Sequence, residues 1–283
     1  MTAKEIIKLL TPPLLIKFGK RLLPLAQNRQ LSEWEYIPEG WAYARNHPEV
    51  KGWNVSAILE TYKSKWERFL EMTQGTEPLG VAHESYQTTR ADIASHNTIM
   101  SFAYALALAA HKRDEISVLD WGGGIGHYYI LAKELLPDVK IDYHCKDLSL
   151  LSGYGATLFP DQHFYNDDSC FERSYNLVLA SGALHYVEDW QNVMENLAKV
   201  TSRYLFVTRL PTTLISPSYV FIQRPYTFGY DTEYLAWCFN RRDFLQELDR
   251  LGLILIREFA ISEPIQIANA PDVCQFRGYF FRR

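Results

Sequence analysis

The chain has little cysteine, no excess of basic residues and no long uninterrupted apolar segment. Four cysteines are widely separated and form no C-x-x-C pair: Cys145, Cys170, Cys238 and Cys274. This spacing favours neither a disulfide framework nor a zinc knuckle, and free thiols fit a reducing compartment.

A net charge of −4 gives no whole-protein field that would attract nucleic acid. No run approaches the length that crosses a bilayer, and Pro12 and Pro13 interrupt the N-terminal apolar residues where a signal peptide would be continuous. We therefore expect a cytoplasmic protein without nucleic-acid partners.

The amino-acid composition is that of an ordinary globular protein. The 283 residues are 47% hydrophobic and 22% charged, enough for one enlarged α/β domain or for two small ones. Aromatic residues reach 14% of the chain, with 18 tyrosines and 7 tryptophans. Such rings often line pockets for flat or sugar-like ligands, although most pack cores.

The most informative stretch is Ile116 to Tyr129, ISVLDWGGGIGHYY. A short apolar run ends in the carboxylate of Asp120, and glycines follow at Gly122, Gly123, Gly124 and Gly126. This pattern predicts a buried strand that delivers a tight turn into a helix. A main chain without Cβ atoms lets a ligand lie almost against it, and the helix start presents free N–H groups. The stretch therefore predicts a turn that holds a nucleotide-like molecule.

The spacing of the glycines indicates which molecule. The dinucleotide fingerprint G-x-G-x-x-G requires a glycine three residues after Gly124, and His127 stands there instead. Asp120 would also repel a pyrophosphate and suits a cationic ligand. The stretch resembles motif I of the class I S-adenosylmethionine (SAM) methyltransferases, D-x-G-x-G-x-G. The resemblance implies that Asp120 lies near the amino-acid end of SAM and that the glycines pass under its ribose and methionine portion.

The rest of the chain alternates strand and helix, as a doubly wound sheet requires. The patterns predict strands at 140–146, 163–166, 175–181, 204–208, 254–261 and 275–281, and helices at 127–136, 148–158, 190–200 and 241–251. With the resemblance, this gives an α/β, doubly wound Rossmann-like, seven-stranded methyltransferase sheet with an antiparallel last strand. We expect an N-terminal helical extension over 1–94 and the methyltransferase domain over 95–283, with a long connection at 210–232 as an acceptor-site insertion.

The resemblance extends to further cofactor contacts. Asp147 ends the predicted strand 140–146 and matches the motif II acid that accepts both ribose hydroxyls; Asp142 is the rival, inside the strand. The 163–166 strand runs into Asp167 and Asp168, of which Asp167 is preferred as the polar partner of adenine, and a helix cap in a solvated turn is the alternative. Ser181 ends the buried strand YNLVLAS and is expected beside SAM.

The segment after Ser181, GALHYVEDW, resembles the motif IV region, which faces the transferred methyl. His185 and Tyr186 would then stand near the reacting centre. Histidine accepts a proton at neutral pH, so His185 is the candidate catalytic base, although a histidine entering a loop is often only a hydrogen-bonding spacer. Acidic residues near His185 match no specific metal site, and we expect no metal.

Acceptor contacts are expected from two other regions. By the resemblance, the N-terminal helical part covers SAM, which makes Tyr86, His96 and Asn97 pocket candidates, with helix capping as the alternative for the last two. Arg224 and Tyr226 lie in the aromatic-rich connection and are candidate substrate contacts. Residues 3–25 form two basic amphipathic segments that either touch a membrane peripherally or pack on the main domain or a second subunit, as in a homo-oligomer.

More narrowly, HNTIMSFAYALA, SVLDWGGGIGHYY and LASGALHYVEDW resemble a group of bacterial methyltransferases that accompany surface-polysaccharide biosynthesis. This implies SAM-dependent O-methylation of a sugar or glycan-precursor hydroxyl. Two alternatives stay open from the sequence: an NAD-dependent oxidoreductase on the same sheet, and a non-catalytic adaptor with a methyltransferase fold that binds a partner through its basic N-terminus.

Overall fold

The structure is a computed structural model that describes residues 32–73, 93–263 and 265–283. Residues 33–283 form one compact unit. Its helices are α3 Ser56–Thr73, α4 Ile93–Ala110, α5 His127–Leu135, α6 Ser149–Leu158, α7 Trp190–Val200 and α8 Arg241–Arg250. Short 3-10 helices are η1 Gly40–Asn46, η2 Asp168–Glu172, η3 Leu184–Tyr186 and η4 Tyr226–Phe228.

Ten strands form the sheet within the described residues. They are β1 Trp34–Tyr36, β2 Glu115–Trp121, β3 Lys140–Lys146, β4 His163–Tyr165, β5 Tyr175–Ser181, β6 Thr201–Thr213, β7 Tyr219–Gln223, β8 Tyr234–Asn240, β9 Ile254–Ala260 and β10 Gln275–Arg282. The neighbours β4, β3, β2, β5 and β6 pair in parallel, while β10 pairs antiparallel with both β6 and β9.

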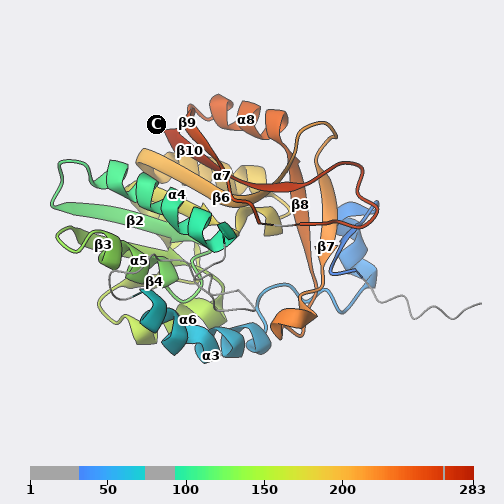
Figure 1. Cartoon of the computed structure of the whole chain (residues 1–283), viewed down its shortest axis with the longest axis horizontal. Helices are drawn as coiled ribbons and strands as arrows, with labels where there is room; N and C mark the ends of the chain where they lie inside the picture. The colour runs from blue at the N-terminus through green and yellow to red at the C-terminus, as the bar shows by residue number, and fades with distance from the viewer. Residues whose placement is uncertain (1–31, 74–92, 264) are drawn as a thin grey trace, which may run out of the picture. The chain divides into compact units, whose positions relative to one another are not determined.

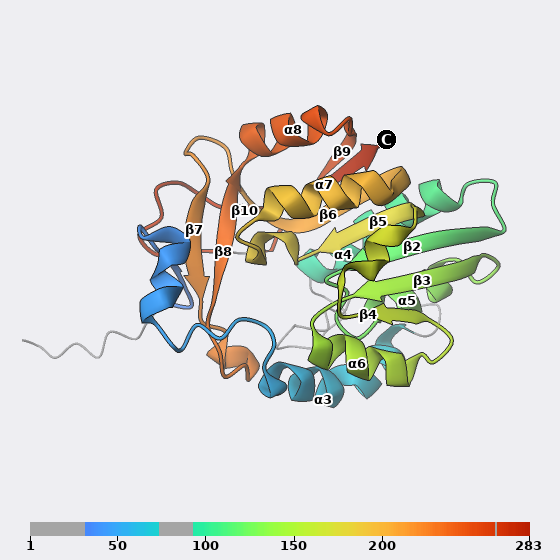
Figure 2. The same cartoon turned by 180° about the vertical axis from the view of Figure 1, so that it is seen from behind.

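Helices cover both faces of the parallel strands, as Figures 1 and 2 show from opposite sides. Alternate residues of β5 enter two different cores: Leu177 and Leu179 pack in the core shared with α4 and α5, whereas Val178 and Ala180 pack in the core shared with α7 and α8. This period of two is what a strand buried on both faces produces. The fold is therefore the α/β, doubly wound class that the alternating pattern predicts. The expected seven strands are too few, because the described residues form a sheet of ten.

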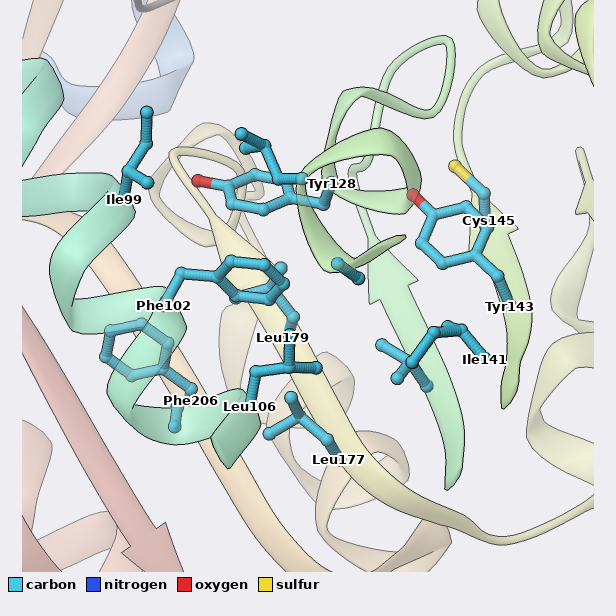
Figure 3. Packing of buried hydrophobic residues seen from close by; sticks show 14 of the residues in the cluster. Ile99, Phe102, Leu106, Tyr128, Ile141, Tyr143, Cys145, Leu177, Leu179 and Phe206 are labelled. Carbon is cyan, nitrogen blue, oxygen red and sulfur yellow. The ribbon is translucent and has the colours of Figure 1, made fainter. Parts of the chain in front are cut away.

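Helix α4 is a core helix of this unit. By length and composition it is the one helix of the described residues that would cross a membrane, and 56% of it is buried. Figure 3 shows Phe102 and Leu106 of α4 directed at Leu177 and Leu179 of β5. Its apolar character is thus accounted for by packing on the sheet.

The prediction of a long loop at 210–232 is wrong. Strand β6 continues to Thr213, and β7 and β8 form an antiparallel ribbon whose outer neighbour is β1. The ribbon joins the main sheet where Thr212 and Thr213 of β6 pair in parallel with the end of β8. The prolines and aromatic residues of this segment looked like loop residues because their pairing partners lie far away in the sequence.

Candidate functional site

A cavity of about 420 Å³ lies at the carboxyl ends of β2, β3 and β5. Ligands of doubly wound sheets bind at this edge, and the volume falls in the ordinary range of small-molecule sites, roughly 300–1,000 Å³. One part of the cavity surrounds the glycine turn and is lined by Trp121, Gly122, Gly123, Gly124, Lys146, Asp147 and Ser181. The other part is lined mainly by residues of η1, the segment before α3, η3 and β8.

The glycine turn has the backbone that only glycine adopts easily. Gly122 and Gly124 have φ of 76° and 63°, in the left-handed region. A Cβ on Gly122 would lie 2.2 Å from Cβ of Ala183, so the turn and the loop after β5 approach more closely than a side chain allows. A Cβ on Gly124 would lie 3.1 Å from Tyr62 of α3, which covers the turn. Bare main chain therefore faces the cavity.

Gly126 has a different role. It is the N-cap of α5, is buried and does not line the cavity. A Cβ there would lie 2.9 Å from the Phe159 ring, so glycine is needed for packing. Of the four glycines expected at the ligand, Gly122, Gly123 and Gly124 line the cavity and Gly126 does not.

Asp120 does not lie on the cavity wall, contrary to the expected approach to the amino-acid end of SAM. Its side chain is 0% exposed and accepts a hydrogen bond from the Tyr143 hydroxyl at 2.5 Å. Burial raises the pKa of Asp120 to about 7, against the lowering effect of the Tyr143 hydrogen bond. A Cβ on Gly123 would lie 2.4 Å from this carboxyl group, so Asp120 supports the turn from beneath.

Asp147 occupies the place at the end of β3 that the sequence assigns to it. Its carboxylate lines the cavity and accepts hydrogen bonds from the Gly124 N–H at 2.7 Å and the Leu148 N–H at 2.6 Å. The first bond ties the glycine turn to the next strand. Asp147 is the one carboxylate among the described lining residues, and Lys146 is the other charged residue of the glycine-turn part.

Ser181 also lines the cavity, and its hydroxyl lies 2.7 Å from the Tyr128 hydroxyl of α5. Asp167 does not reach the cavity. It is exposed and caps η2, accepting from the N–H and the hydroxyl of Ser169, and these bonds lower its pKa. The capping alternative therefore describes Asp167 in this structure.

Tyr186 lines the cavity as expected, whereas His185 does not. His185 is 2% exposed in η3, with its ring centroid 3.9 Å from that of Tyr186 and 6.3 Å from that of Phe276. The two neighbouring side chains thus differ in their access to the cavity although their rings are in contact, and sequence adjacency could not show this. The assignment of His185 as base stays a prediction, and the geometry gives it no direct access to the cavity.

Arg224 and Tyr226 are not cavity residues, so their expected substrate contact is corrected. The buried Arg224 guanidinium pairs with Glu35 at 2.9 Å and with Glu233 at 3.3 Å, and the Tyr226 hydroxyl donates to Glu233 at 2.7 Å. Two carboxylates thus already pair with the charge of the arginine. The cluster fastens the segment containing β1 to the β7–β8 ribbon.

The N-terminal candidates also differ from expectation. His96 and Asn97 lie inside the first turns of α4 and outside the cavity lining, so they neither cap the helix nor line the site. The Asn97 amide instead donates to the carbonyls of Ala260 and Ile261 at the end of β9, at 3.4 and 3.3 Å. Tyr86 lies outside the described residues.

Several cavity residues escaped the sequence reasoning. Trp41, Lys51, Trp53, Tyr62 and Tyr234 are not among the site candidates of the sequence, yet all five line the cavity. A tryptophan in an irregular segment is the one sequence signal that could have pointed here, since such rings serve both packing and binding.

Asp142, His144 and His163 bring their ligand atoms within 4.8 Å of one another, away from the cavity. Arg173 donates to His144 Nε2 at 2.9 Å and to Asp142 at 2.8 Å. Burial lowers the pKa of His144 to about 4. An arginine therefore already supplies the positive charge that a metal ion would bring.

Comparison with known families agrees with this geometry. The family model described as a methyltransferase domain matches residues 96–257, more than half of the chain. The chain belongs to this methyltransferase-domain family. No curated protein matches the sequence.

Solved methyltransferase structures resemble the chain at low identity. A candidate sarcosine dimethylglycine methyltransferase from Galdieria sulphuraria is 14% identical, with a TM-score of 0.50 over 79% of this chain and 98% of that one. A magnesium protoporphyrin IX methyltransferase from Synechocystis PCC 6803, crystallised with SAM, is 14% identical, with a TM-score of 0.48 over 81% and 96%.

Proposed function

We propose that this protein transfers a methyl group from SAM to a hydroxyl of a small molecule, a sugar or glycan precursor. The observation that carries the proposal is one continuous cavity in which the glycine turn and Asp147 open onto an aromatic-lined space. A donor lying along the turn would present its reactive end to a molecule held among the rings.

The residues at the turn fit the donor. Gly122 and Gly124 leave main chain bare where a ligand would lie, and Asp147 places a carboxylate beside it. When bound, SAM supplies an electrophilic methyl group on a positively charged sulfur. An acidic lining residue is complementary to a cation, and a carboxylate that accepts from both ribose hydroxyls forms strong charge-assisted bonds.

The chain's own contribution to the reaction is positioning. Placing two reactants at about 3 Å in line supplies much of the acceleration of a displacement reaction. The rings of Tyr62 and Tyr186 lie on the cavity wall, and Tyr62 also packs over Gly124 of the turn. His185 remains the proposed base for the hydroxyl proton, behind Tyr186 in this structure.

Calorimetric titration with SAM and with NAD, side by side, tests the proposal against the oxidoreductase alternative. We expect SAM to bind and NAD not to bind. Asp147→Asn removes the charge while keeping the shape, and should weaken SAM binding by about tenfold or more, the loss of one charge-assisted hydrogen bond. Asp138→Asn, an exposed acid outside the cavity, is the matched control and should bind as the wild type does.

A folded protein that binds NAD and not SAM would contradict the proposal. A protein that binds neither would favour the adaptor alternative. Residues 3–25 lie outside the described residues, so the cytoplasmic setting, a peripheral membrane contact and a homo-oligomer stay proposals. Co-sedimentation with anionic vesicles and light scattering would test the last two.

A further inference from the structure

The part of the cavity beyond the glycine turn is defined by Trp41, Lys51, Trp53, Tyr186 and Tyr234, and we name it the aromatic chamber. We propose that the aromatic chamber binds a methyl acceptor that carries a ring and an anionic group, with the ring against the aromatic walls and the anion at Lys51. The inference rests on the proposed function, because it concerns the acceptor of the same reaction.

The aromatic side chains that line the chamber pack against one another. The ring centroids of Trp53 and Tyr234 are 4.6 Å apart with 24° between their planes, a stacked pair. Tyr186 lies 5.0 Å from Trp53 and edge-on to Tyr234 at 4.9 Å, and its hydroxyl donates to Gln223 at 3.1 Å. Rings held in this way offer preformed apolar surfaces, which favour a ligand with an apolar ring face.

The charges of the chamber select among such ligands. Lys51 is the one ionisable residue of the chamber apart from its tyrosines, and the chamber residues that the structure describes include no carboxylate. The nearest acid to Lys51 Nζ, Asp231, is 3.9 Å away with a side chain 87% exposed, which is a weak pair. An anionic group would find a counter-charge here, and an ammonium group would find none.

The position of these residues in the chain supports a role in specificity. Trp41, Lys51 and Trp53 precede residue 96, where the match to the methyltransferase family model begins. Tyr234 belongs to the ribbon of β7 and β8. Three of the five chamber residues therefore lie outside the region that the family model matches, and Tyr186 and Tyr234 lie within it.

Two series of probes separate ring chemistry from charge. The first holds the phenol ring constant: 4-hydroxybenzoate, phenol and tyramine are anionic, neutral and cationic at pH 7. The second holds the sugar ring constant: glucose 1-phosphate, methyl glucoside and glucosamine. Each probe is titrated into protein saturated with S-adenosylhomocysteine (SAH), and binding is measured by calorimetry. The two series distinguish an aromatic from a sugar ring.

We expect the anion to bind most tightly and the cation most weakly in at least one series. Lys51→Glu should weaken the anionic member of that series about fivefold and leave the neutral member unchanged, since a partly exposed pair is worth about 1 kcal/mol. Lys199→Glu makes the same charge change on the exposed face of α7, outside the cavity, and should have no effect. Trp53→Ala should weaken the anionic and neutral members alike.

Three results would overturn the inference while SAH binding is intact: no anionic probe binds, a cationic probe binds most tightly, or Lys51→Glu and Lys199→Glu behave alike. Loss of SAH binding in the wild-type protein would instead overturn the proposed function. The two failures are therefore distinguishable in one set of titrations.

Discussion

The wild-type protein should become less stable as pH rises because of Asp120, and Asp120→Asn should abolish this part of the pH dependence. Asp120 is fully buried beneath the glycine turn, and one of its oxygens has no hydrogen-bond partner among the described residues. Burial raises its pKa from the ordinary 3.8 to about 7. The folded protein therefore holds a proton on this carboxyl group over a range in which the unfolded chain does not.

The sign and size follow from this difference. A carboxyl group with a raised pKa stabilises the fold most below pH 3.8, and this contribution is lost as pH rises through 7. Between pH 5 and pH 8 the unfolded chain is ionised at this group, whereas the folded protein ionises only near pH 7. Over this interval the linkage amounts to about two pH units at 1.36 kcal/mol each, so the free energy of unfolding should fall by about 3 kcal/mol. Asparagine does not ionise in this range and has no such term.

The free energy of unfolding in urea is measured at pH 5 and pH 8 for the wild type and for Asp120→Asn. The change between the two pH values is then compared between the two proteins, so that the contributions of other titrating groups cancel. The wild type should lose about 3 kcal/mol more than the variant over this interval. Asp138→Asn, at an exposed acid, should keep the wild-type dependence. Equal pH dependence in the wild type and Asp120→Asn would refute the reasoning that the buried carboxyl group is protonated.

Three further changes test other parts of the account. Gly122→Ala forces a Cβ to 2.2 Å from that of Ala183 at a φ of 76°, and should destabilise by about 2 kcal/mol or more in thermal unfolding, whereas Gly153→Ala meets nothing within 4 Å and should be neutral or stabilising. Arg224→Met leaves two glutamates without their buried partner and should cost about 3–5 kcal/mol in urea unfolding; a cost below 1 kcal/mol would show that the pair is not intact in solution. His185→Ala should slow methyl transfer with SAM affinity unchanged if the histidine is the base, and normal turnover would remove that role.

Local patterns predicted much of the main sheet. Strands β3 and β5 and helix α7 have the bounds that their apolar patterns indicate, and Asn240 caps α8 by accepting from Arg242 and Asp243. These elements are specified by residues close together in the chain: a buried run, a cap or a glycine after the last turn. Asp147 was also found from sequence because its place is set by the end of its own strand.

The rest depends on contacts that sequence spacing does not contain. Arg224 looked like a substrate contact because its partner Glu35 lies 189 residues earlier. The β7–β8 ribbon was missed because it is stabilised by pairing with β1 and β6. The aromatic chamber was missed for the same reason, since Trp53 and Tyr234 meet only after both distant segments have folded.

The central claim is that the Gly122–Gly124 turn and Asp147 hold the methyl donor. A crystal structure of the protein with SAH tests it most directly. The account predicts density for SAH along the turn, its ribose hydroxyls within hydrogen-bond distance of the Asp147 carboxylate, and its sulfur directed toward the aromatic chamber. Density for SAH at another place, or no SAH density along the turn in protein that calorimetry shows to be saturated, would contradict it.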